Sequence, residues 1–322
     1  MNSDRRRFLT SATTLGAGIF AGNLFAEGNP NTMETPDSQG RFRYCLNTST
    51  IRGQELGIVE EVRIAGEAGY DGIEPWMGSI NTYVEGGGKL SDLKKQIEDA
   101  GLTVDSAIGF AQWIVDDPEQ RKAGLEEAKR DMNTLREIGG TRIAAPPAGA
   151  TNGSKLDLFV VAERYRTLLE LGASIGVIPQ LEVWGFSTNL SRLGETVFVC
   201  VEADHPSACV LPDVYHIYKG GSGFGGLELL SATAIQVFHV NDYPAEPGRQ
   251  DINDSHRVYP GDGIAPLKEI LTMVGGTEGA RTNRPVTLSL ELFNREYWKQ
   301  NAMDVARTGL AKMKAAVAGL SG

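Results

Sequence analysis

Residues 156–183 read LDLFVVAERYRTLLELGASIGVIPQLEV, a stretch that predicts one helix followed by one strand. Apolar residues recur at helical spacing over 156–175. Gly176 then stands where a helix commonly ends in a left-handed residue. In the run Ile178–Val183 the polar residues, ending in Glu182, share one face, as in a strand whose other face is covered by helices. Such units are typical of α/β proteins.

The same unit recurs along the chain. Eight segments have the pattern of strands: Phe42–Asn47, Gly72–Pro75, Thr103–Ile108, Thr141–Ala145, Ile178–Val183, Cys209–Asp213, Ile235–Val240 and Val286–Leu292. Helical patterns are clearest in five segments: Gln54–Ala68, Leu90–Ala100, Glu119–Ile138, Leu156–Ile175 and Asn301–Val317. Glycine follows four of these helices at the cap position: Gly69, Gly101, Gly139 and Gly176.

Eight strands that alternate with helices, without a long antiparallel segment, predict a closed (β/α)₈ TIM barrel. A doubly wound open sheet is the alternative. The GxGxxG fingerprint of its dinucleotide-binding form does not follow the first predicted strand.

The first residues differ in character from the rest. Residues 5–9 (RRRFL) precede an apolar, Gly- and Ala-rich stretch over 11–25, and this order resembles a twin-arginine export signal. The apolar stretch is too short for a membrane-spanning helix. We therefore predict a signal peptide over 1–26, a linker over 27–41 and the TIM barrel over 42–322. The protein is expected in the periplasm, with no stable membrane anchor after the signal is cleaved.

The composition, with 41% hydrophobic and 22% charged residues, is that of an ordinary globular protein. Its formal net charge of -10 disfavours nucleic acid as a partner, because phosphates are bound by Lys and Arg. We therefore expect a small-molecule partner. The sequence leaves open whether the chain forms a homo-oligomer.

Four predicted strands carry a residue that can bind a metal at their carboxyl end or one residue before it: Glu182, Asp213, His239 and Glu291. The first three are spaced like successive βα units of roughly 30 residues, and a longer gap precedes Glu291. Because the carboxyl ends of barrel strands meet at one rim, these side chains are expected to converge. A solvated strand end explains one such residue better than it explains four. Carboxylates with one imidazole suit one divalent metal, Mn²⁺ or Mg²⁺ first, with Zn²⁺ and Co²⁺ as alternatives.

Further side chains are expected at the same rim: Asn47, Glu74, Trp76, Trp113, Pro146, Trp184, Phe186, His216 and Arg257. A single aromatic residue at a strand end more often packs in the core than it lines a pocket. As a group, however, these aromatics would form an apolar wall suited to the C–H face of a sugar.

In their order and strand placement, these segments resemble the sugar-phosphate isomerase/epimerase superfamily, the xylose-isomerase-like TIM barrels. The resemblance covers about residues 42–320. Six motifs carry it: Gly69-Tyr70-Asp71-Gly72-Ile73-Glu74, Leu181-Glu182, Asp213-Val214-Tyr215-His216, His239-Val240-Asn241-Asp242, Arg257-Val258-Tyr259-Pro260-Gly261-Asp262-Gly263 and Leu290-Glu291. Together they are specific to the superfamily, but not to one substrate.

Ketose 3-epimerases and inosose dehydratases of this superfamily bind one divalent metal through two glutamates, an aspartate and a histidine. The resemblance implies the same four ligands here: Glu182, Asp213, His239 and Glu291. The residues expected to contact substrate are His216, Arg257, Glu74, Trp113 and Trp184. Many relatives have Asn-His after the first glutamate, where this chain has Val183-Trp184, so the resemblance does not identify the sugar.

The expected chemistry is proton transfer next to a carbonyl. A metal that holds the carbonyl oxygen and a neighbouring hydroxyl stabilises the enediolate that forms when carbon loses its proton. Glu182 and Glu291 come from strands well separated around the ring, so we expect one to remove the proton and the other to return it. Return to the opposite face gives epimerisation, and loss of a β-hydroxyl gives dehydration. The residues do not decide between an isomerase or epimerase and a dehydratase.

Two other classes of protein remain as alternatives. Metal-dependent apurinic endonucleases use the same barrel, but they bind several zincs and need many histidines, of which this chain has four. A non-catalytic exported sugar-binding barrel would keep the aromatic residues without needing an intact set of ligands. We therefore expect an enzyme.

Overall fold

The structure is a computed structural model that describes residues 41–231, 233–275 and 285–320. The strands are β1 (Phe42–Asn47), β2 (Gly72–Glu74), β3 (Thr103–Val104), β4 (Arg142–Ala145), β5 (Ile178–Glu182), β6 (Val210–Leu211), β7 (Val237–Val240) and β8 (Val286–Leu290). The α-helices are α1 (Ile58–Ala68), α2 (Met77–Glu85), α3 (Leu90–Asp99), α4 (Pro118–Glu137), α5 (Leu158–Ile175), α6 (Leu193–Glu202), α7 (Val214–Lys219), α8 (Leu267–Gly275) and α9 (Ala302–Ala318). Residues 1–40, which hold the predicted signal peptide and nearly all of the predicted linker, lie outside the described residues.

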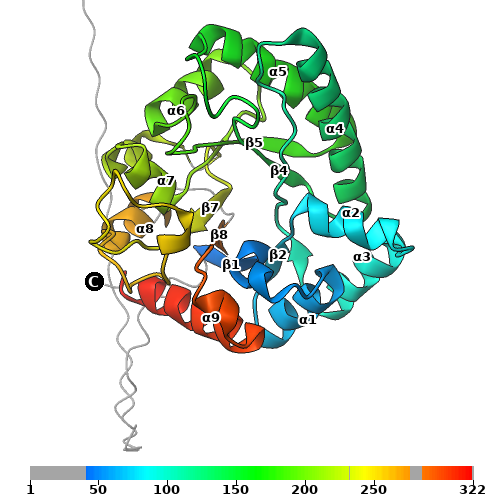
Figure 1. Ribbon diagram of the computed structural model, residues 1–322, viewed down its shortest axis with the longest axis vertical. Coiled ribbons are helices and arrows are strands. Elements are labelled where there is room, and N and C mark those ends of the chain that lie inside the picture. Colours follow the sequence, from blue (N-terminus) through cyan, green and yellow to red (C-terminus); the bar gives the residue numbers. More distant parts are fainter. Residues whose placement is uncertain (1–40, 232, 276–284, 321–322) are drawn as a thin grey trace, which may run out of the picture. The chain divides into compact units, whose positions relative to one another are not determined.

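The predicted (β/α)₈ barrel is confirmed: helices surround the parallel strands in a ring (Figure 1). The strands form two hydrogen-bonded sheets, ordered β3-β2-β1-β8-β7 and β4-β5-β6. Two seams join these sheets. At the β3–β4 seam the Ala144 N–H donates to the Ala107 carbonyl (2.8 Å), and at the β6–β7 seam the His239 N–H donates to the Pro212 carbonyl (2.9 Å). These bonds close the ring.

Local chemistry explains where the elements begin and end. Strand β6 stops at Leu211 because the next residue, Pro212, has no N–H with which to extend a ladder. Helix α1 begins at Ile58 rather than at the expected Gln54, because Gly57 has a φ of 75°, outside the helical region. The four predicted cap glycines all have positive φ, as expected: Gly69, Gly101, Gly139 and Gly176.

Alternate strand residues pack in different layers, as in β7. Phe238 belongs to the large apolar cluster between the strands and the helices, whereas Val237 joins a small separate cluster with residues of other strands. His239 shares the face of Val237 because side chains alternate along a strand. Its ring therefore points to the inside of the barrel.

Across the three described segments, every helix is too short or too polar to cross a membrane.

Candidate metal centre

The four predicted metal ligands come together at the carboxyl ends of β5 to β8. Glu182 is the last residue of β5 and His239 lies in β7. Asp213 and Glu291 follow the ends of β6 and β8. None of these side chains belongs to a residue more than 3% exposed. Buried charges need partners or a bound ion, so the geometry around them is informative.

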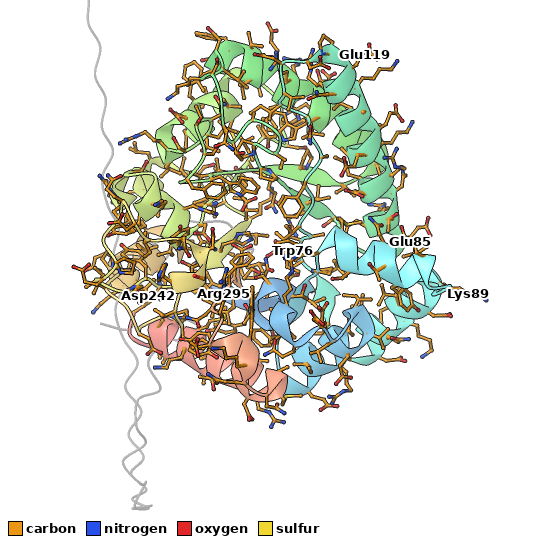
Figure 2. All side chains as sticks on the ribbon, viewed as in Figure 1. Trp76, Glu85, Lys89, Glu119, Asp242 and Arg295 are labelled. Carbon is orange, nitrogen blue, oxygen red and sulfur yellow. The ribbon has the colours of Figure 1, made fainter. Side chains whose placement is uncertain are left out.

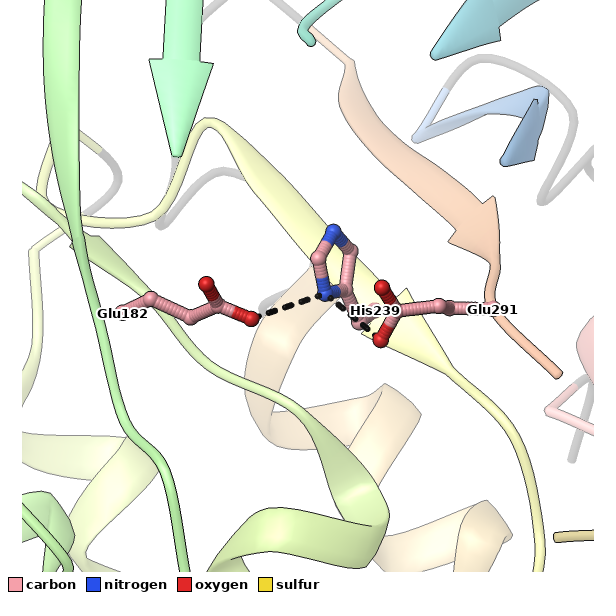
Figure 3. Close-up of side chains that lie close together, drawn as sticks. All are labelled: Glu182, His239 and Glu291. Atoms are coloured by element: carbon pink, nitrogen blue, oxygen red, sulfur yellow. Dashed lines mark ion pairs between the residues drawn. The ribbon is translucent and has the colours of Figure 1, made fainter. Parts of the chain in front are cut away.

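His239 lies at the centre of this group. Its Nδ1 is 3.3 Å from Glu291 Oε2, 3.8 Å from Glu182 Oε1 and 3.9 Å from Asp213 Oδ2. Figure 3 shows Glu182 and Glu291 reaching toward this nitrogen from opposite sides. Nδ1 is buried, and no described residue forms a hydrogen bond with it.

The other ring nitrogen of His239 is held by Glu74, the last residue of β2. Nε2 is 3.0 Å from Glu74 Oε2, which also accepts hydrogen bonds from Ser289 Oγ (2.6 Å) and Asn47 Nδ2 (3.0 Å). A carboxylate oxygen accepts this bond, so Nε2 donates to Glu74, and Nδ1 is the nitrogen that faces the other carboxylates. Glu74 is 0% exposed. In this structure Glu74 holds His239, and its predicted contact with substrate stays a prediction.

Arg257 brings positive charge to the group. Its Nη1 donates to Asp213 Oδ2 (3.0 Å) and to Glu291 Oε2 (2.7 Å). Its Nη2 lies 3.0 Å from His216 Nε2, which must accept because a guanidinium only donates. The guanidinium also lies over the ring of Tyr215, 4.5 Å from the centroid. Arg257 and His216, both predicted to contact substrate, thus lie beside the candidate metal ligands.

These neighbours shift the protonation of one another. Burial raises the pKa of Glu182, and the negative charge of Glu291 adds to this effect. Burial would also raise the pKa of Glu291, but His239 and Arg257 outweigh it and hold that pKa below its usual range. Burial and Arg257 lower the pKa of His216. Two carboxyls whose pKa values are pushed apart are suited to opposite roles in proton transfer.

The residues present fit a divalent metal. Glu182, His239 and Glu291 each offer a ligand atom, and these atoms lie within 4.8 Å of one another. Asp213 is close, but its Oδ2 already accepts a hydrogen bond from the Asn241 amide (2.8 Å). His239 Nδ1, once a bound metal displaces its proton, would join the carboxylate oxygens in a mixed donor set for such an ion. Glu182, His239 and Glu291 form the candidate metal centre, with Asp213 beside it.

The two tryptophans predicted to bind substrate lie in different places. Trp184 is half-buried at the rim, and its ring centroid is 6.5 Å from that of His216. Trp113 is 1% exposed, and its Nε1 donates to the carbonyl of Pro146 (2.9 Å). Trp113 thus packs in the core beyond the end of β4, and its predicted contact with substrate stays a prediction.

Two rim aromatics, Phe110 and Phe293, are not among the residues predicted from the sequence. Their ring centroids lie 5.1 Å and 5.9 Å from that of Trp76, which stands at the inner end of α2 (Figure 2). Phe110 also lies 6.1 Å from Trp184, so the rings form an arc beside the metal centre. Phe293 stands two residues after Glu291, a spacing that could have identified it, whereas Phe110 lies in a loop without such a signal.

Comparison with known proteins agrees with this architecture. The chain is 26% identical over 221 residues to 3-dehydro-D-guloside 4-epimerase of Escherichia coli strain K12, which covers 64% of this chain and 78% of that protein. It is 22% identical over 284 residues to inosose isomerase of Bacillus velezensis, which covers 86% and 97%. Its fold is similar to the crystal structure of the IOLI protein with a bound zinc atom, with a TM-score of 0.76, 20% identity and coverage of 86% and 99%. The family model of the xylose isomerase-like TIM barrel matches residues 62–316, and the chain belongs to this family.

Proposed function

We propose that this protein is a divalent-metal-dependent sugar isomerase or epimerase that acts on a keto-sugar or related polyol through an enediolate. The observation that carries the proposal is His239 Nδ1, which is buried, has no hydrogen-bond partner among the described residues and faces three carboxylates within 3.9 Å. Two relatives, a 4-epimerase and an isomerase, support this class of reaction.

Glu182, His239 and Glu291 would hold the metal, and Asp213 is the proposed fourth ligand. When bound, such a metal supplies Lewis-acid stabilisation for the negative charge of the enediolate. Mn²⁺ or Mg²⁺ suits a set of mainly carboxylate ligands. Zn²⁺ is the first alternative, because a protein of similar fold binds zinc, and Co²⁺ is the second.

Glu182 and Glu291 are the proposed proton carriers. They approach His239 from opposite sides (Figure 3). The lowered pKa of Glu291 favours the ionised state, which removes a proton. The raised pKa of Glu182 favours the protonated state, which returns one to the opposite face. Such a transfer inverts the carbon, whereas loss of a neighbouring hydroxyl from the same enediolate would make the protein a dehydratase.

Arg257 and His216 are proposed to orient the sugar. Arg257 can only donate hydrogen bonds, and the lowered pKa of His216 keeps its ring neutral. Arg257 contacts Glu291 and His216, and Trp184 lies beside His216. A hydroxylated face of the substrate would meet the first two residues, and a C–H face would meet the aromatic ring.

Elemental analysis and proton exchange in D₂O test this proposal. Wild type loaded with Mn²⁺ should exchange the hydrogen next to the carbonyl of a keto-sugar such as D-fructose or D-tagatose. Glu291→Gln keeps a coordinating oxygen, yet exchange should fall by about 10²–10⁴-fold because a general base is lost. Glu85→Gln, the same change at an exposed site of α2, should exchange like wild type.

Other results would redirect the assignment. Equal exchange in Glu291→Gln and wild type would move the base to Glu182 or His216. Sugar binding without exchange in the wild type, over a panel of keto-sugars and metals, would instead support the non-catalytic binding protein. New signals of an unsaturated or dehydrated product would identify the dehydratase.

A further inference from the structure

A cavity of about 640 Å³ opens next to the rim, between the turn after β1 and the helices α1 and α2. The polar and aromatic residues that line it include Arg52, Glu61, Trp76, Ser79, Thr82 and Tyr83. Of these, only Trp76 also belongs to the aromatic arc beside the metal centre. The reaction proposed above therefore leaves most of this cavity unexplained.

Glu61 is the most unusual residue of the cavity wall. It lies on α1 and is only 4% exposed, yet its Oε2 is buried and no described residue forms a hydrogen bond with it. Burial raises the pKa of this carboxyl to about 7. A buried carboxyl without a partner is costly. The other buried residues of α1, such as Val62, are apolar, so packing of the helix does not require a carboxyl at this position. Glu61 thus points to a ligand that satisfies its oxygen atoms.

Arg52 adds a donor to the same cavity. Its guanidinium lies 4.4 Å from the ring centroid of Trp76. It is close enough to Glu61 to lower that carboxyl's pKa, although burial outweighs it. Within the part of the chain that the structure describes, Arg52 has no carboxylate within 4.0 Å, so the two side chains do not form an ion pair.

The ligand class follows from this unpaired acid and base. An anion would meet the carboxylate of Glu61, and a cation would meet the guanidinium of Arg52. A neutral polyhydroxyl ligand can donate to the first and accept from the second. The rings of Trp76 and Tyr83 offer apolar faces to its C–H groups. This combination matches a sugar ring.

Trp76 connects the cavity with the metal centre. Its Nε1 donates to Asn47 Oδ1 (3.1 Å), and Asn47 Nδ2 donates to Glu291 Oε1 (3.2 Å). One face of the indole contacts Arg52 of the cavity, while Phe110 of the rim packs against the same ring. A ligand in the cavity and a sugar at the metal centre would thus share one tryptophan as a wall.

We propose that this cavity is a second saccharide subsite, which takes the sugar unit attached to the keto-sugar at the metal centre. The substrate class is then a glycoside or disaccharide rather than a free monosaccharide. The binding of a sugar in the cavity is independent of the proposed reaction, whereas the link to the keto-sugar rests on it.

Two glycines allow a test that removes no buried group. Gly78, the second residue of α2, lines the cavity, and a Cβ added there meets no heavy atom within 4 Å. Gly78→Leu therefore adds a side chain at the cavity wall, with open space around its Cβ. Gly194, the second residue of α6, is likewise exposed with open space around an added Cβ. Gly194→Leu is the matched control at a distant helix.

The experiment uses three sugars and measures saturation transfer by NMR and affinity by calorimetry. Methyl α-D-glucopyranoside, which has no ketone, probes the cavity alone. Isomaltulose, a glucose unit joined to a ketose, is compared with D-fructose. In wild type and Gly194→Leu we expect isomaltulose to bind at least about tenfold more tightly than D-fructose. Gly78→Leu should bring this ratio close to one and abolish methyl glucoside binding. Glu61→Gln should lower both the ratio and the affinity for methyl glucoside.

Other outcomes overturn the proposal. The absence of methyl glucoside binding in wild type, or its persistence in Gly78→Leu, removes the subsite. A ratio near one in wild type removes the link to the keto-sugar. If methyl glucoside binding is lost in Gly78→Leu but no keto-sugar exchanges its hydrogen with D₂O, the reaction proposed above fails while the cavity remains a sugar site.

Discussion

Glu74 and His239 act as one unit, because the carboxylate holds Nε2 and leaves Nδ1 facing the other acids. Glu74→Gln keeps the shape of the side chain but weakens the acceptor. We expect the affinity for Mn²⁺ and Zn²⁺, measured by calorimetric titration, to fall about 10–100-fold. Glu85→Gln should bind these metals like wild type. Unchanged affinity in Glu74→Gln would mean that His239 does not need this partner.

Glu61 should make the stability of the protein depend on pH. Its pKa is about 7 in the folded protein, against an ordinary value of 4.5. The folded state therefore binds the proton more tightly between these values, and stability falls as the pH rises through this window. The loss amounts to about 3 kcal/mol at 1.36 kcal/mol per pH unit.

Glu61→Gln removes this titration, because the amide is neutral at every pH. Relative to wild type, the variant should therefore gain stability between pH 5 and pH 8 in urea unfolding. Asp131, whose pKa burial raises to about 6, contributes a slope of the same sign in both proteins. The difference between them, rather than either slope, is the quantity to compare. If the free energy of unfolding depended on pH in the same way in both proteins, Glu61 would have a partner in solution.

At the scale of elements, one aspartate organises the loop that carries Arg257. Asp242 follows β7, and its carboxylate accepts hydrogen bonds from the N–H groups of Tyr243, Gly261, Gly263 and Ala265. Gly263 is required at its position, because an added Cβ would come within 2.3 Å of Asp242 Oδ1. Hydrogen bonds to Asp242 thus tie the segment 257–263 to the segment 239–242. This connection positions the Arg257 guanidinium beside Asp213 and Glu291.

The elements also show how far the sequence leads. Period and cap signals are local, so the strands that carry Glu182 and His239 and the cap at Gly176 were predictable. Glu74 and Trp113 also stand near strand ends, but the sequence did not predict their partners, His239 and the Pro146 carbonyl. Which way such a side chain turns depends on residues far along the chain, such as Ser289 for Glu74. The Glu61 cavity was not predictable for the same reason.

At the scale of the whole molecule, we propose that residues 1–26 direct export of the folded protein through the twin-arginine pathway. Arg5 and Arg6 would be the paired arginines of such a signal. The double change Arg5→Lys with Arg6→Lys should leave the protein in the cytoplasm, as measured by cell fractionation and immunoblotting. Arg63→Lys, an exposed change on α1, is the control and should not alter its location. Unchanged export of the double variant would contradict the twin-arginine assignment.

The β6–β7 seam has a consequence for the lifetime of the fold. Glu182 and Asp213 lie at the ends of strands in the β4-β5-β6 sheet, whereas His239 and Glu291 lie at the ends of strands in the β3-β2-β1-β8-β7 sheet. An ion bound by these residues would cross-link the two sheets. Removing it with a chelator should speed deuterium uptake by the backbone amide of His239, while amides in the middle of β1 keep their rate. Unequal protection of this kind would make metal supply a determinant of resistance to proteases as well as of turnover.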